Sequence, residues 1–266
     1  DSITTGDYNV GVGDNALTGV TTGAGNVAVG DNTLKTNTTG SYNVAVGRGA
    51  MKYATTGSNN SAFGDYALAT GALTGNNNTA RGFNSMYKNT TGASNTATGS
   101  YSLYYNTTGA NNTAIGYQAL HSNTTGSYNT ANGYGSLYSN TTGSYNTASG
   151  YRALNANTTG GTNIASGYQA LFYNTTGTQN TATGYNSLYS NSTGSNNVAT
   201  GYQSLYANTT GSSNTTCGIQ ALYNNTTSNN NVAVGQKSLY SNTTGNGTAI
   251  GYRALYSNTT GIRNTA

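Results

Sequence analysis

The sequence predicts an all-β protein, a parallel β-solenoid (β-roll) of about sixteen coils of 17 residues. A Thr-Thr-Gly triplet recurs with that spacing, for example at Gly92, Gly109 and Gly126, and a Leu or Met column and an Ala column keep the same period. Stacked units this short bury a core only against their neighbours. Gly, Asn, Thr, Ser and Tyr dominate and do not favour helix, and the strict Leu and Ala columns argue against disorder.

The first segment of the repeat reads Asn-Thr-Ala-x-Gly in its most regular copies, and we expect it to form a short strand. The residue before the alanine is usually β-branched, as at Val27, Thr113 and Ile164, which suits a strand. The Asn column that includes Asn112 can form a hydrogen-bonded ladder between coils. The glycine stands in all fifteen complete copies, which indicates a positive φ or a close approach that a Cβ would block.

Leu or Met stands four residues after this glycine in every copy, and we expect that column to be buried. The Asn-Thr-Thr-Gly segment that follows has turn chemistry, and we expect it to be exposed, with two short strands in each coil. An aspartate in place of Leu137 should then open the stack, and the same change at Asn140 should do little.

Residues 1–266 are predicted to form a single repeat array, an excerpt of a longer fibre, with two irregularities. One extra residue near 69–75 should form an outward loop while Leu68 and Met86 stay in register. The shortened copy at Asn246-Gly247-Thr248 should tighten a turn.

One large apolar side chain per coil makes a thin core, so we expect a second surface to be buried between chains. The Ala column and the Tyr columns are the candidates for that surface. The expected partner is therefore a second copy of the chain, in a parallel homotrimer or an end-to-end filament.

Composition argues against an enzyme. The only carboxylate side chains are Asp1, Asp7, Asp14, Asp31 and Asp65, so most of the chain cannot supply a general acid and base or a carboxylate-bound metal, and we expect no cofactor.

The remaining reactive or charged side chains are few. His121 stands in a Tyr column and should stack there, and Cys217 should act as a small apolar residue. Nine scattered Lys and Arg residues predict no nucleic-acid site, and no apolar run is long enough to span a membrane.

Asn-x-Ser/Thr sequons recur in the turn, which makes their asparagines candidate glycan-attachment sites. Turn chemistry alone also explains these residues, and glycans on successive coils would crowd one another. The candidates are Asn37, Asn89, Asn106, Asn123, Asn140, Asn157, Asn174, Asn191, Asn208, Asn225, Asn242 and Asn258.

The segment Asn43-Val44-Ala45-Val46-Gly47 resembles the head repeat of trimeric autotransporter adhesins, although the 17-residue period is longer than usual for that repeat. The longer segment from Asn112 to Leu120, followed by Asn123-Thr124-Thr125-Gly126, looks like repeats of bacterial and phage tail-fibre-like surface proteins. The resemblance implies a left-handed β-roll that assembles as an extracellular homotrimer with adhesive or spacer roles.

These observations predict a non-enzymatic extracellular or cell-surface fibre, structural or adhesive, which presents repeated Asn, Thr and Tyr columns and is glycan-coated in one version of the hypothesis. Many weak contacts to a surface or to surface glycans would add up by multivalency. The alternative is an ice-binding β-solenoid with a flat Thr template. The columns considered for that role contain Thr107, Thr124, Thr141, Thr158 and Thr175.

Overall fold

A computed structural model describes residues 5–266 and confirms the all-β parallel solenoid. The chain divides into two compact units, residues 1–132 and 133–266, each a stack of coils, and the expected start of the array at residues 1–4 lies outside the described residues. Each coil within residues 5–266 contributes a single short strand, and no residue of that range is helical. The expectation of two strands per coil was wrong, because the rest of the coil is built from turns and bends.

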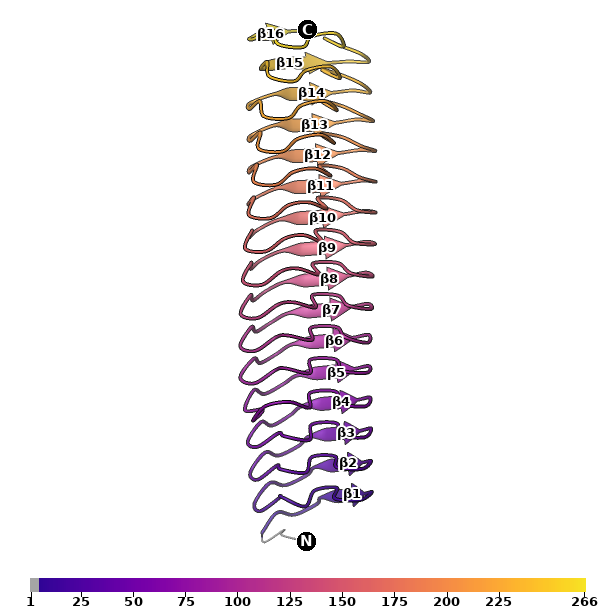
Figure 1. Ribbon diagram of the computed structural model, residues 1–266, viewed down its shortest axis with the longest axis vertical. Helices are drawn as coiled ribbons and strands as arrows, with labels where there is room; N and C mark the ends of the chain where they lie inside the picture. Colours follow the sequence, from indigo (N-terminus) through magenta and orange to yellow (C-terminus); the bar gives the residue numbers. More distant parts are fainter. Residues whose placement is uncertain (1–4) are drawn as a thin grey trace. The chain divides into compact units, whose positions relative to one another are not determined.

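Strands in each unit lie one above the next with their arrows aligned (Figure 1). The strands of the first unit are β1 (Val10–Val12), β2 (Val27–Val29), β3 (Val44–Val46), β4 (Ser61–Phe63), β5 (Thr79–Arg81), β6 (Thr96–Thr98), β7 (Thr113–Ile115) and β8 (Thr130–Asn132). Those of the second are β9 (Thr147–Ser149), β10 (Ile164–Ser166), β11 (Thr181–Thr183), β12 (Val198–Thr200), β13 (Thr215–Cys217), β14 (Val232–Val234), β15 (Gly247–Ile250) and β16 (Asn264–Thr265).

The core of each coil is a leucine packed against an alanine of the same chain. Leu103 and Ala97 are both fully buried, as are nearly all their equivalents in other coils. At Gly11, the one Ala-column position occupied by glycine, an added Cβ would lie 3.3 Å from Cδ1 of Leu17. The Ala column is therefore covered inside its own coil. The Ala column was a candidate for a surface buried between chains, and that expectation was wrong.

The leucine column has an unusual backbone conformation. Leu103, Leu120 and Met86 have φ angles of 52°, 52° and 49°, in the left-handed region. Valine and isoleucine are particularly unfavourable there because their branched Cβ crowds the backbone. This explains why the core column contains leucine and methionine but never a β-branched residue.

The glycine after the strand meets both conditions that the sequence indicated in most coils. Gly184 has a φ of +127°, and a Cβ added to it would lie 2.6 Å from the carbonyl oxygen of Gly201 in the next coil. A side chain is therefore excluded by conformation and by space together.

Both irregularities leave the strand register unchanged. Across the extra residue Ala62 still pairs with Ala80, and the exposed Gly71 and Ala72 form the outward loop that was expected. Leu73, in the same stretch, is fully buried and pairs with Ala54 of the preceding coil. The loop is therefore smaller than predicted. In the shortened copy, Gly247 takes the place of the ladder asparagine.

Candidate functional site

Asparagines at the start of each strand form a buried ladder, which confirms the expectation for this column. In Asn180 both the backbone N–H and Nδ2 donate to Oδ1 of Asn163, at 3.0 and 3.2 Å. Nδ2 also donates to the carbonyl oxygen of Gly194 at 2.9 Å. Asn180 thus links three coils, and the ladder asparagines from Asn26 to Asn231 are fully buried.

The sequon asparagines form a second buried ladder, which sequence reasoning missed. Nδ2 of Asn174 donates to Oδ1 of Asn157 at 2.8 Å and to the carbonyl oxygen of Gly177 at 3.0 Å. Eleven of the twelve candidate glycan-attachment asparagines are fully buried, and only Asn258 is partly exposed. The buried eleven are Asn37, Asn89, Asn106, Asn123, Asn140, Asn157, Asn174, Asn191, Asn208, Asn225 and Asn242.

This burial corrects the expectation that the turn is exposed. The turn asparagines are not exposed, so a substitution at Asn140 is not harmless. In this fold the amide nitrogen to which an N-glycan would be joined has no access to solvent, and in Asn174 it donates two hydrogen bonds to the protein. A glycan on that atom would displace these hydrogen bonds, and N-glycan attachment at the candidate asparagines stays a prediction.

The first threonine of a Thr-Thr-Gly triplet, which we call the inner threonine, is half-buried in the described coils except at Thr259, which is exposed. Its hydroxyl typically donates to a carbonyl oxygen in the next coil, as in Thr107 to Thr124 and Thr158 to Thr175, both at 3.0 Å. Thr141 and Thr175 of the proposed ice-binding columns do the same. These hydroxyls are engaged within the fold, so the column is not a free template.

The second threonine of each triplet is exposed in every coil, and we call this column the outer threonine row. Its hydroxyls have no hydrogen-bond partner among residues 5–266. The row consists of Thr5, Thr22, Thr39, Thr56, Thr74, Thr91, Thr108, Thr125, Thr142, Thr159, Thr176, Thr193, Thr210, Thr227, Thr244 and Thr260.

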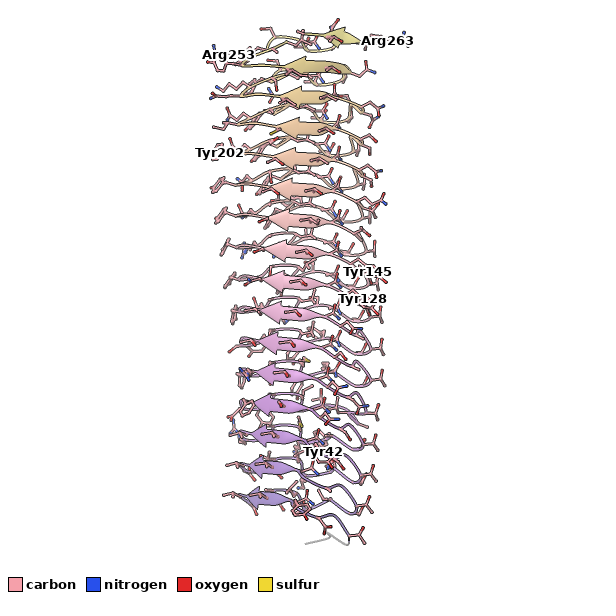
Figure 2. All side chains as sticks on the ribbon, turned by 180° about the vertical axis from the view of Figure 1, so that it is seen from behind. Tyr42, Tyr128, Tyr145, Tyr202, Arg253 and Arg263 are labelled. Carbon is pink, nitrogen blue, oxygen red and sulfur yellow. The ribbon has the colours of Figure 1, made fainter. Side chains whose placement is uncertain are left out.

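Aromatic side chains stack from coil to coil in two outward columns, as expected. In the first column Tyr168 and Tyr185 have ring centroids 4.9 Å apart and planes within 6°. In the second, Tyr206 and Tyr223 are 5.0 Å apart and within 3°. Figure 2 shows Tyr202 projecting beyond the end of β12. Since neighbouring rings cover each other's faces, the columns offer mainly ring edges and hydroxyls to a partner.

Burial raises the pKa of three phenol groups in the second stack. Desolvation, followed by a hydrogen bond to Tyr173, raises the pKa of Tyr189 to about 12. Desolvation also raises the pKa of Tyr104 and Tyr223. At these three positions the stack therefore favours the neutral phenol.

His121 stacks on Tyr104 with centroids 5.4 Å apart, as expected, and burial lowers its pKa. Cys217 is exposed on the outward side of β13. Seven of the nine cationic side chains lie over aromatic rings, among them Arg152 over Tyr151 at 5.5 Å.

Residues 5–266 contain no group of three His, Cys, Asp or Glu side chains placed to hold a metal ion. No helix in that range has the length and apolar character needed to cross a membrane.

An open hollow of about 410 Å³ lies beside the extra residue of the first unit. It is lined by Thr36, Tyr53, Thr55, Gly71 and Ala72. Tyr53 is the one titratable side chain among these lining residues.

The geometry defines the class of protein as a parallel β-solenoid with a 17-residue coil and two buried asparagine ladders. No protein-family model, curated protein or solved structure matches the chain significantly.

Proposed function

We propose that the chain is part of a non-enzymatic extracellular or cell-surface fibre with a structural or adhesive role. The observation that carries this proposal is that each coil uses one set of residues to hold the stack together and another set to form its surface. Buried amides and leucines link successive coils, whereas threonines, tyrosines and strand residues form repeated outward rows within each unit. Such rows repeat the same weak contact many times, which suits multivalent attachment to a surface or to surface glycans.

Self-association is the second part of the proposal, as a homotrimer or as an end-to-end filament. Because the Ala column is internal, the outward strand face is the better candidate contact. In β1 it presents Val10 and Val12, which are 51% and 57% exposed, and β2 continues the column with Val29. Exposed apolar rows of this kind favour association with another copy.

Native mass spectrometry together with electron microscopy tests this proposal. We expect multiples of the chain mass and fibrous particles, and a charge at Val29 (Val29→Glu) should dissociate them without unfolding the chain. Thr176→Val, on a different surface, serves as the control. A chain that stays monomeric at high concentration and shows no binding to cell surfaces or glycan arrays would contradict the proposal.

Ice binding through the inner threonines is not favoured, because most of those hydroxyls already donate to carbonyl oxygens. A measurement of thermal hysteresis separates the two functions, and we expect none.

A further inference from the structure

Every position of the outer threonine row is threonine, although packing alone would allow other residues there. In the strand column before the alanine, Thr113, Ile164 and Val198 replace one another freely. A position that needed only a β-branched side chain would show the same exchange. The outer row is threonine in every coil, which indicates that the hydroxyl itself is required.

No function inside the fold accounts for that hydroxyl. The inner threonine shows what an internal role looks like: Thr175 Oγ1 donates to the carbonyl oxygen of Ser192 at 3.0 Å. In the coil where serine, Ser192, takes the inner position, its hydroxyl still donates to the carbonyl oxygen of Thr209. Thr176 and Thr193, the adjacent outer threonines, are exposed and have no such partner.

The row also persists where the sequon is lost. Val20 and Ala54 replace the turn asparagine in two coils, yet Thr22 and Thr56 remain. In the irregular coil the asparagine and the inner threonine are both replaced, and Thr74 is still present and exposed. The outer threonine is therefore not retained as part of an N-glycosylation sequon.

We propose that the outer threonine row is a site of O-linked glycosylation. In this step Oγ1 of the threonine attacks the anomeric carbon of an activated sugar, a sugar phosphoester or nucleotide sugar supplied by a glycosyltransferase. A C–O bond to threonine forms, the bond from the anomeric carbon to the phosphate oxygen breaks, and the hydroxyl proton passes to the transferase base or the leaving phosphate. No oxidation or reduction occurs.

The surroundings of the row leave space for a sugar. The residue two positions later is small in most coils, as at Ala110, Ser144 and Gly161. Successive strands are about 4.8 Å apart, so short saccharides rather than branched ones fit next to one another. A row of sugars would cover one side of each coil with neutral hydroxyls.

This inference rests on the proposed extracellular function, because it requires exposure to a protein-glycosylation pathway. The test is intact mass and fragment mapping of the protein from its native source. We expect mass increments of whole saccharide residues, assigned to Thr142, Thr159 or Thr176 and not to the neighbouring Thr141, Thr158 or Thr175.

Matched variants made in the same host complete the experiment. Thr176→Val should remove one saccharide increment, whereas Thr175→Val should remove none. A native mass equal to that of the bare chain, or sugars found only on inner threonines or asparagines, would overturn the inference. Fibres formed by a chain without sugars would contradict the O-glycosylation inference and still support the proposed function. Glycosylated monomers that bind no surface would contradict the proposed fibre and still support O-glycosylation.

Discussion

Replacing Asn174 by alanine should destabilise the second unit by about 4 to 5 kcal/mol. The side chain makes three hydrogen bonds: its Nδ2 donates to Asn157 and Gly177, and its Oδ1 accepts from Asn191 at 2.8 Å. At about 1 kcal/mol net for each bond, their loss costs about 3 kcal/mol.

Two of the three former partners retain another bond. The carbonyl oxygen of Gly177 still accepts from Asn163, and Nδ2 of Asn191 still donates to Gly194. Oδ1 of Asn157 is left buried with no donor among the described residues, which adds about 1 to 2 kcal/mol.

Urea unfolding of the whole chain, followed by circular dichroism, measures this loss. The same turn provides graded controls: Thr175→Val should cost about 1 kcal/mol for one hydrogen bond, and Thr176→Val should stay within about 0.5 kcal/mol. Equal effects at Asn174 and Thr176, or a neutral Asn174→Ala, would refute the buried ladder. If a substitution changes the slope of the unfolding free energy against urea concentration, the transition is no longer comparable between variants. The stabilities of the variants are then compared by native-state hydrogen exchange of amides in the second unit.

Three further predictions concern the core, the glycine column and the aromatic stack. Leu137→Asp should cost more than about 4 kcal/mol and abolish protease resistance, since it puts an unpaired charge at a fully buried position; unchanged proteolysis would contradict the core assignment. Gly184→Ala should lower the melting temperature markedly, because its φ of +127° and the nearby Gly201 oxygen exclude a Cβ, whereas an unaltered melting curve would show that the coils can separate there. Tyr189, with its pKa raised to about 12, stabilises the folded state as the neutral phenol. This contribution is complete below about pH 10 and is lost as the pH rises toward 12, so an alkaline titration of tyrosinate absorbance should show late ionisation that Tyr189→Phe removes.

The period of the sequence was sufficient to predict the fold class, the buried leucine column and the constrained glycine. These depend on one-dimensional regularity, which a solenoid converts directly into columns. The left-handed backbone at the core column could also have been inferred, since Leu103 and its equivalents are never replaced by valine or isoleucine.

Burial of the turn asparagines could not be read from residue type, because asparagine serves exposed turns and buried ladders equally well. One signal did point to it: Val20 and Ala54 occupy the same column, and apolar residues at a turn position favour burial. The internal Ala column was misjudged for a related reason. The core was judged too thin for a single chain because only large apolar side chains were counted. The buried asparagine amides, which fill the rest of each coil, were left out of that count.

Most coils contribute one asparagine to each of the two buried ladders, and these ladders reduce the contribution that the surface must make to folding. Their hydrogen bonds fix the spacing and register of successive coils inside each unit, so the thin apolar core no longer demands a second chain. Outward side chains that make no contact with a neighbouring coil are then free of a folding role. A column such as the outer threonine row, kept even at Thr74 where the turn itself is rebuilt, therefore reflects what the surface meets outside the fold. A modification or contact made by the folded chain should be sought there and not at the buried asparagines.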